Sequence, residues 1–230
     1  MDAGSLADAI VISDLHLGSE VCQAKRLEDF VEAAPGAARQ LVLNGDMFDS
    51  LDFHRLKKHH WRVLSKLRKI SDQIPVTWVC GNHDGQAEML GQLLGLVVHD
   101  EHVVMTGGKS LLCLHGHQFD EFIEKFPVIT WAADQAYRLL QWMDKTHQLA
   151  RWAKTSSKQF LHNVARVKTQ AVEYMRKGGH DLVCCGHTHH PESCPPYFNS
   201  GCWTEASCCS WLEVADGEVI LRHGGINHSS

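Results

Sequence analysis

The sequence predicts a mixed α/β domain in which short buried strands alternate with helices. Two observations support this prediction. Short apolar runs recur along the chain and end in a turn, which is typical of strands buried on both faces. Segments whose apolar residues repeat at helical spacing lie between them. The chain has 230 residues, of which 44% are hydrophobic, so we expect residues 1–230 to form one domain with a sizeable core.

Five of these apolar runs end in residues of the kinds that bind metal ions. The runs and the turns that follow them are residues 10–17 (IVISDLHL), 41–49 (LVLNGDMFD), 76–84 (VTWVCGNHD), 111–117 (LLCLHGH) and 182–189 (LVCCGHTH). A single Asp or His after a strand is usually a turn residue. Five repeats of the same pattern indicate instead one cluster of metal ligands at one edge of a sheet.

The first run delivers Asp14 and His16 from an extended segment. Side chains alternate along a strand, so residues two apart share a face and one metal ion can bind both. Residues 22–34 then have the apolar spacing of a helix, which Pro35 ends.

The second run delivers Asp46, and Asp49 follows on the loop. Residues 53–73 are expected to form a basic amphipathic helix with Trp61 in its apolar stripe. The third strand, residues 76–80, ends in the sequence G-N-H-D. A short helix over residues 86–94 and a hairpin over residues 97–105 and 110–114 are expected to follow.

Residues 119–179 are expected to form a helical insertion between two ligand-bearing strands. One of its two apolar stripes consists of Phe160, Val164, Val167, Ala171 and Tyr174. Residues 145–177 carry eight Lys or Arg and one acid, a local charge of +7, whereas the whole chain carries −5. The segment is either a solvated helix face or a surface for anions such as substrate phosphate, an acidic membrane or nucleic acid.

The remaining segments close the fold. A strand over residues 182–185 precedes the sequence G-H-T-H-H-P, and closing antiparallel strands are expected at residues 197–201, 210–214 and 219–223. Nine cysteines, an odd number, favour reduced thiols buried in the core over disulfides. His59, His60, His99, His102 and His228 lack the ligand pattern and are expected at the surface.

The composition argues against a membrane-spanning or exported protein. No apolar run reaches the length of about 18 residues that a transmembrane helix needs. Residues 1–9 have neither a basic start nor an apolar core of a signal peptide. We therefore expect a cytoplasmic protein.

Taken in order, the pieces D-x-H, G-D-x-x-D, G-N-H-D, H-G-H and G-H-x-H resemble the motif series of the calcineurin-like metallophosphoesterase family. The resemblance extends from residue 10 to about residue 191, without the insertion. It implies a two-sheet α/β/β/α sandwich with helices outside and metal ions at the carboxyl ends of the strands. Any single piece would be weak, but the whole series is highly specific.

The resemblance also implies a ligand set for two divalent metal ions. The first ion would be held by Asp14, His16, Asp46 and His189. The second would be held by Asp46, Asn82, His115 and His187, so Asp46 would bridge the two. Mixed His, Asp and Asn ligands suit Mn, Fe or Zn better than Ca or Mg, and Mn is the ion we expect. Two such ions, about 3.5–4 Å apart, clamp a phosphate and activate water.

Other roles follow from the same resemblance. His83 matches the family's histidine that stabilises or protonates the leaving oxygen, and Asp49 matches the acid that orients it. His117 and His190 flank ligands, where they would either contact phosphate or support the ligands.

The substrate is less closely specified. Ser50 and Leu51 follow Asp49, where the family's protein phosphatases have Arg-Gly, which argues against that branch. The length, the G-H-T-H-x-P ending and the basic insertion look like the UDP-2,3-diacylglucosamine pyrophosphatases of lipid A biosynthesis. That branch typically has Arg at the position of His83 and an acid at that of His117, so a related enzyme with another substrate is the alternative.

In that branch the inserted helices cover the site as a lid and receive acyl chains. Arg151, Lys154 and Lys158 would then attract a nucleotide diphosphate, or would bring the protein to the inner face of the membrane as a peripheral contact. No stable protein partner is expected.

Two further interpretations stay open. A phosphodiesterase or nuclease would use the basic insertion to follow a phosphate backbone, with Trp131, Trp142 and Trp152 as stacking residues. A scaffold without catalytic activity should have lost metal ligands, whereas this sequence keeps the whole series.

Overall fold

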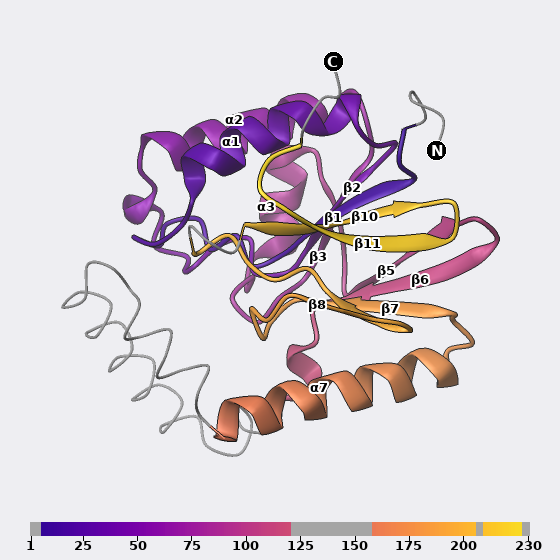
Figure 1. Cartoon of the computed structure of the whole chain (residues 1–230). Coiled ribbons are helices and arrows are strands. Elements are labelled where there is room, and N and C mark those ends of the chain that lie inside the picture. The colour runs from indigo at the N-terminus through magenta and orange to yellow at the C-terminus, as the bar shows by residue number, and fades with distance from the viewer. Residues whose placement is uncertain (1–5, 121–157, 206–208, 227–230) are drawn as a thin grey trace.

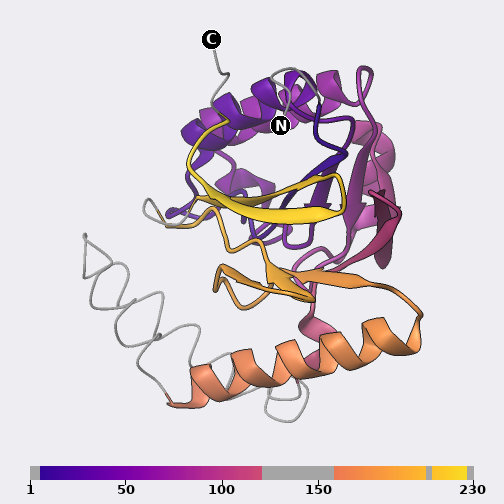
Figure 2. The ribbon, with the colours of Figure 1, turned by 45° about the vertical axis from the view of Figure 1, so that its right-hand side comes forward.

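The computed structural model describes residues 6–120, 158–205 and 209–226 as two stacked β-sheets between outer helices (Figure 1). Figures 1 and 2 show α1 and α2 along one outer face and α7 along the opposite face. The expected two-sheet α/β/β/α sandwich is confirmed. Among the helices that the structure describes, none is long and apolar enough to cross a membrane.

The first sheet has the strand order β11-β10-β1-β2-β3-β4. Its strands are β1 (Ala9–Ile12), β2 (Leu41–Asn44), β3 (Val76–Val79), β4 (Val97–His99), β10 (Ser210–Ala215) and β11 (Glu218–His223). The four strands from β1 to β4 run parallel to one another, and β10 joins β1 antiparallel. The carboxyl ends of β1, β2 and β3 therefore lie at one edge.

The second sheet has the order β5-β6-β7-β9-β8. Its strands are β5 (Glu101–Thr106), β6 (Lys109–Leu114), β7 (Leu182–Cys185), β8 (Glu192–Cys194) and β9 (Tyr197–Asn199). Strands β6 and β7 are parallel, so the last two ligand-bearing runs also end on the same side. The expected strand at residues 197–201 is present, but β9 runs parallel to β7 and antiparallel to β8, a strand that the sequence did not predict.

The outer layers consist of four α-helices and three short 3₁₀ turns within the described residues. They are α1 (Ala24–Ala33), η1 (Ala34–Gly36), η2 (Phe53–Arg55), α2 (Lys58–Ile70), α3 (Ala87–Leu94), η3 (His117–Phe119) and α7 (Lys158–Lys177). Each helix buries an apolar stripe against a sheet, which is the reason that these sequences form stable helices.

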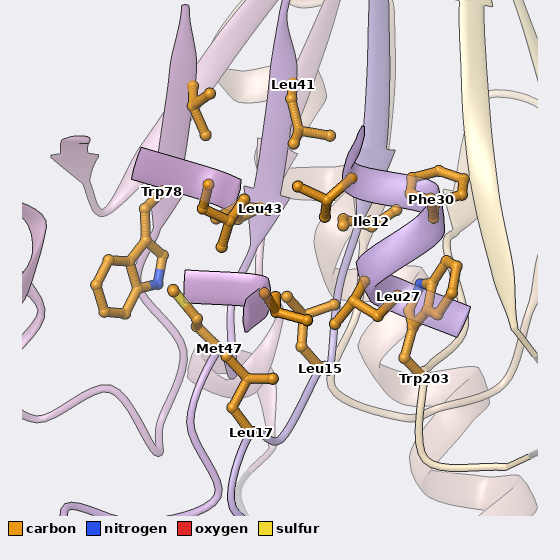
Figure 3. Close-up of a cluster of buried hydrophobic side chains, with 14 of the residues drawn as sticks. Ile12, Leu15, Leu17, Leu27, Phe30, Leu41, Leu43, Met47, Trp78 and Trp203 are labelled. Carbon is orange, nitrogen blue, oxygen red and sulfur yellow. The ribbon is translucent and has the colours of Figure 1, made fainter. Parts of the chain in front are cut away.

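Alternation along β1 explains why its sequence is apolar throughout. Ile10 and Ile12 point to the helix-covered side, while Ala9 and Val11 point into the space between the sheets. Strands buried on both faces have continuous apolar runs of this kind. Figure 3 shows Ile12 packed near Leu27 and Phe30 of α1.

The prediction for the helix α2 was wrong in detail. The helix expected over residues 53–73 begins only at Lys58, and Trp61 is 54% exposed because the buried stripe lies on another face of the helix. His60, expected at the surface, is buried. Its Nδ1 accepts a hydrogen bond from the backbone N–H of Lys57 and so caps the start of α2.

The first strand of the expected hairpin, residues 97–105, does not form as one strand. The chain leaves the first sheet after β4, turns at Asp100, and enters the second sheet as β5. The strand pattern is continuous across this point because both short strands carry similar residues. The hairpin partner of β6 is therefore β5 alone.

The expected insertion is partly a layer of the sandwich itself. Val164, Val167, Ala171 and Met175 of α7 are buried, and α7 packs on the second sheet, whereas Tyr174 is 45% exposed. Residues 158–177 therefore belong to the core of the fold and not to a detachable lid. The other stripe, together with Arg151 and Lys154, lies outside the described residues, and the side chain of Lys158 is not described.

The described cysteines agree with the prediction only in part, because Cys22 and Cys80 are half-buried and Cys194 is exposed. All eight within the described residues are reduced, and Cys113, Cys184 and Cys185 are buried in the strands as expected.

Candidate metal centre

The carboxyl ends of strands from both sheets bring carboxylate and imidazole groups to one place. Asp14 and Asp46 follow β1 and β2 of the first sheet, and His115 and His189 follow β6 and β7 of the second. Their ligand atoms form three overlapping groups in which all atoms lie within 4.8 Å of one another. These groups are Asp14–His16–His189, His16–Asp46–His83 and Asp14–Asp46–His115.

Individual distances show how closely the groups overlap. Asp14 Oδ1 lies 3.2 Å from His189 Nε2, and His16 Nε2 lies 3.2 Å from the same nitrogen. Asp46 Oδ2 lies 3.7 Å from His16 Nε2 and 3.4 Å from His115 Nε2. Asp46 thus stands between the donors of the first group and His115, at the position that a bridging carboxylate would need.

The unsatisfied polar atoms of this cluster fit a cation. Among the described residues, no hydrogen bond reaches Asp14 Oδ1 or His115 Nε2, although both atoms are fully buried. Buried polar atoms of proteins are nearly always satisfied. Carboxylate and imidazole donors together suit divalent Mn, Fe or Zn. The donor set therefore fits the divalent ions that the sequence predicted.

The backbone of the cluster is held in a conformation that L-residues rarely adopt. Six non-glycine residues within the described ranges have a positive φ. Five of them are predicted ligands: Asp14, His16, Asp46, His187 and His189. Such conformations concentrate at functional sites, where the surrounding structure maintains them.

Three glycines of the motifs leave room for the candidate ligands. A Cβ on Gly45 would overlap the His115 ring, and a Cβ on Gly81 would overlap the Asp46 carboxylate. A Cβ on Gly186 would stand 2.5 Å from Asp14 Oδ2. These close approaches explain why the sequence has glycine directly before Asp46, Asn82 and His187.

The charges of the cluster are strongly coupled. Burial would raise the pKa of Asp14, but His189 and His115 beside it lower that pKa to about 2. Burial lowers the pKa of His16 to about 4, against the opposing effect of Asp46. Burial would also lower the pKa of His115, but Asp46 and Asp14 raise it to about 9.

These directions define the charge of the cluster. At neutral pH the two carboxylates are ionised and His16 is neutral, which is the state that metal ligands need. His115 keeps a proton that a metal ion would have to displace.

The comparisons with known proteins agree with this geometry. Residues 9–191 match the family model described as calcineurin-like phosphoesterase. The chain belongs to the calcineurin-like phosphoesterase family. This family implies a metal-dependent phosphoester hydrolase that binds divalent metals, and this chain has the candidate ligand groups for them. Among curated proteins, none matches the sequence.

The solved structures that match this chain are distant in sequence. The phosphoesterase Yfce from E. coli is 19% identical, with a TM-score of 0.48 over 92% of this chain and 96% of that chain. A predicted phosphoesterase from Streptococcus pneumoniae is 16% identical, with a TM-score of 0.45 over 96% and 92%. Vps29 from Entamoeba histolytica, solved with Zn²⁺, is 15% identical, with a TM-score of 0.42 over 93% and 89%.

His83 lies beside the cluster, next to His16 and Asp46. Its backbone N–H donates to Asp46 Oδ1 over 3.0 Å, and its ring packs edge-on to that of His16 at 5.1 Å. Its Nδ1 lies 3.0 Å from the backbone carbonyl of Asp49, which can only accept, so Nδ1 carries the proton of this bond. The neutral ring therefore has its lone pair on Nε2.

Asp49 contacts the site through both its backbone and its side chain. Its backbone carbonyl holds His83, whereas its carboxylate faces Arg55, with Oδ2 2.6 Å from Arg55 Nη1. The other oxygen lies 3.8 Å from His16 Nδ1. Asp49 therefore holds His83 through its backbone carbonyl, and the role of its carboxylate toward His83 stays a prediction. Arg55 is a neighbour of the site that the sequence did not reveal.

Asp84 is a second residue whose role the sequence did not reveal. Its buried carboxylate accepts hydrogen bonds from four N–H groups: the backbone of Met47, Phe48 and Gly81, and Trp78 Nε1. Two of these donors follow β2, one lies in β3 and one follows β3. Asp84 thus joins the segments that carry Asp46 and His83.

Of the remaining predicted residues, His117 lies next to the cluster, whereas Asn82 and His190 are exposed. His117 lies beside His115 and His187, with ring centroids 5.5 and 6.5 Å away, and burial together with these two rings lowers its pKa to about 4. Asn82 is exposed in the turn before His83. His190 is also exposed, and its ring faces Phe160 of α7 at 6.3 Å.

His187 is held by a residue that carried no signal in the sequence. Its Nε2 lies 2.9 Å from Asp120 Oδ2, and its backbone N–H donates to Asp14 Oδ2 over 3.0 Å. Asp120 follows η3 outside every motif. Its proximity to His187 arises because η3 follows β6, and β6 is the parallel neighbour of β7.

Proposed function

We propose that this protein is a phosphoesterase that uses two divalent metal ions, with Mn as the working ion. The observation that supports this best is the convergence of buried, unsatisfied Asp14 and His115 atoms around Asp46. The first ion would be held by Asp14, His16, Asp46 and His189. The second would be held by Asp46, Asn82, His115 and His187. When bound, the ions supply Lewis-acid stabilisation of the phosphoryl group and activation of water.

Residues around His83 would position the proton transfer to the leaving oxygen. The hydrogen bond from His83 Nδ1 to the Asp49 carbonyl leaves Nε2 of the same ring for the substrate. We assign the protonated form of His83 to donation from Nε2 to the leaving oxygen. Asp49 and Arg55, joined by their ion pair, hold the loop that carries this carbonyl. His117 is assigned to phosphate contact as a neutral hydrogen-bonding group, and His190 to the rim of the site.

For the substrate, we propose a lipid-linked nucleotide diphosphate of the UDP-2,3-diacylglucosamine type, cleaved in the manner of the lipid A pathway enzymes. The basic segment supports this proposal, because Arg151, Lys154 and Lys158 would attract a diphosphate or an anionic membrane surface. The protein would then act in the cytoplasm at the inner face of the membrane, without a stable protein partner. A phosphodiesterase or nuclease acting on another nucleotide substrate is the second candidate, supported by the same positive charge.

The test is a hydrolysis screen with Mn²⁺. The substrates are bis-p-nitrophenyl phosphate, UDP-2,3-diacylglucosamine, cyclic nucleotides and single-stranded DNA, with a chelated sample as control. Metal-dependent cleavage of the lipid nucleotide above all others supports the proposal. Preferential cleavage of DNA or cyclic nucleotides moves the assignment to the second candidate. No cleavage of any phosphoester with metal bound overturns the enzymatic proposal.

The expected lid needs a narrower test than the sequence suggested. Since α7 is part of the core, only residues 121–157 are replaceable by a Gly-Ser linker. Such a variant should still bind metal and cleave bis-p-nitrophenyl phosphate, but should lose turnover of UDP-2,3-diacylglucosamine. Unchanged turnover of that substrate would contradict the assignment of this segment to substrate selection.

A further inference from the structure

A chain of three side chains connects α7 to the candidate metal centre. Asp120 Oδ2 lies 2.9 Å from His187 Nε2 and 2.8 Å from Asn163 Nδ2. Asp120 is 6% exposed, and Asn163 lies near the start of α7. A carboxylate oxygen accepts while an amide nitrogen donates, so Asn163 donates to Asp120.

The same contact decides which nitrogen of His187 can face a metal ion. Because the carboxylate accepts, Nε2 carries the proton in this hydrogen bond, and the lone pair of the neutral ring is left on Nδ1. The His187 backbone is fixed at φ 61° and its N–H donates to Asp14 Oδ2. The ring stands edge-on to His115 with centroids 5.4 Å apart. The side chain thus has Nε2 engaged by Asp120, which leaves Nδ1 as the nitrogen that could bind a metal ion.

The position of Asn163 gives this arrangement a second support. Val167, Ala171 and Met175 bury α7 against the second sheet, which fixes the helix that carries Asn163. Asp120 is the last described residue before residues 121–157, and α7 is the first described element after them. The Asp120–Asn163 bond therefore joins the two ends of this segment directly beside His187.

We infer that Asp120 is a positioning residue that orients His187 through Nε2 and so selects Nδ1 as its metal-binding atom, and that Asn163 in turn orients Asp120. The inference rests on the proposed metal site. A carboxylate that accepts from the far nitrogen of a histidine fixes the tautomer and raises the basicity of the metal-binding nitrogen. The helix α7 would then act on the second metal site as well as on the stability of the fold.

A purely structural role for the same contacts is the alternative to exclude. The test uses Asp120→Asn and Asn163→Ala, with Lys168→Ala as the matched control. Lys168 also lies on α7 and pairs with Glu192 of β8, so its replacement removes an anchoring contact of the helix away from His187. All three variants should lower the melting temperature.

Metal binding is the first measurement. Metal-free protein is titrated with Mn²⁺ in a calorimeter. In Asp120→Asn the affinity of the second site for Mn²⁺ should fall on the order of 10–100-fold. The first site should be nearly unchanged, and Asn163→Ala should give a smaller loss at the second site. Lys168→Ala should bind both ions like the wild type. Equal affinities in Asp120→Asn and Lys168→Ala would overturn the inference.

The tautomer is the second measurement, and it does not depend on activity. Long-range ¹H–¹⁵N NMR of the metal-free protein, with His187 assigned from a His187→Gln spectrum, should show a proton on Nε2 and none on Nδ1. A neutral ring with its proton on Nδ1 would contradict the inference. Should the wild type bind two ions but hydrolyse no phosphoester, the proposed function fails, while these two measurements still decide the role of Asp120.

Discussion

Asp46 and His115 face each other across the junction of the two sheets, with Asp46 Oδ2 3.4 Å from His115 Nε2. Asp46 follows β2 of the first sheet, and His115 follows β6 of the second. A cation bound by both residues would connect the sheets, and an ion that binds only the folded state stabilises it. Several measurable consequences arise from this relationship.

Asp46→Asn should weaken both metal ions and abolish phosphodiester hydrolysis, because it removes the negative charge that stands between His16 and His115. Asp216→Asn is the matched control, since both residues have φ 52° and Asp216 lies in the hairpin between β10 and β11. Elemental analysis of the purified proteins is the measurement. Two full equivalents of metal in Asp46→Asn would show that Asp46 does not bridge.

Metal binding should release a proton from His115. Its pKa is raised to about 9 in the metal-free protein, so at pH 7 the ring is protonated and the ion must displace that proton. Metal affinity should therefore rise with pH and level off above about pH 9. Calorimetry in two buffers of different ionisation enthalpy measures the protons released. An affinity that is independent of pH between 6.5 and 9 would contradict the prediction.

His83→Ala should leave metal binding intact and lower kcat. A general acid contributes roughly 10²–10⁴-fold to the rate. The loss should be smaller for nitrophenolate esters, whose leaving group needs no proton, than for alkyl esters. An equal loss for both classes would remove the acid role and leave electrostatic stabilisation alone.

Gly45→Ala should disrupt the centre more than its backbone strain alone would. Gly45 has φ 90°, and an added Cβ would overlap the His115 ring. Gly108→Ala isolates the strain, because Gly108 has φ 80° with no heavy atom within 4 Å of an added Cβ. Gly108→Ala should cost on the order of 1 kcal/mol of unfolding free energy. Gly45→Ala should cost more and should also reduce metal content, whereas equal effects would show that the His115 ring can move aside.

The sequence predicted the parts of the site that depend on strand ends. Asp14 and His189 are 175 positions apart along the chain, yet both follow strands whose carboxyl ends share an edge, and their side chains lie 3.2 Å apart. A repeated local pattern was sufficient to bring them together. The helical layer on the second sheet was also detectable, since Val164, Val167 and Ala171 repeat at helical spacing.

Contacts without a repeating pattern could not be predicted in this way. Asp120 meets His187 through η3, which follows β6 beside its parallel neighbour β7, and Asp120 belongs to no repeated motif. The switch between sheets at Asp100 was missed because β4 and β5 have similar residues. The helix α2 starts five residues later than expected. Trp61 was assigned to the buried face because it is apolar, but apolar character alone does not decide which face of a helix is buried.

The position of β1 has a consequence for the order of folding during synthesis. Strand β1 lies between β2 and β10, and Ala9 pairs with Val214. The ribosome synthesises β2 early, but it synthesises β10 only after most of the chain has been made. One edge of β1, the strand that precedes Asp14, therefore stays unpaired until β10 is made. His189 is synthesised after β2 and before β10. Long-range pairing of this kind is slow and leaves an edge exposed to other chains. We expect nascent chains that end before β10 to be held by chaperones and to bind no metal.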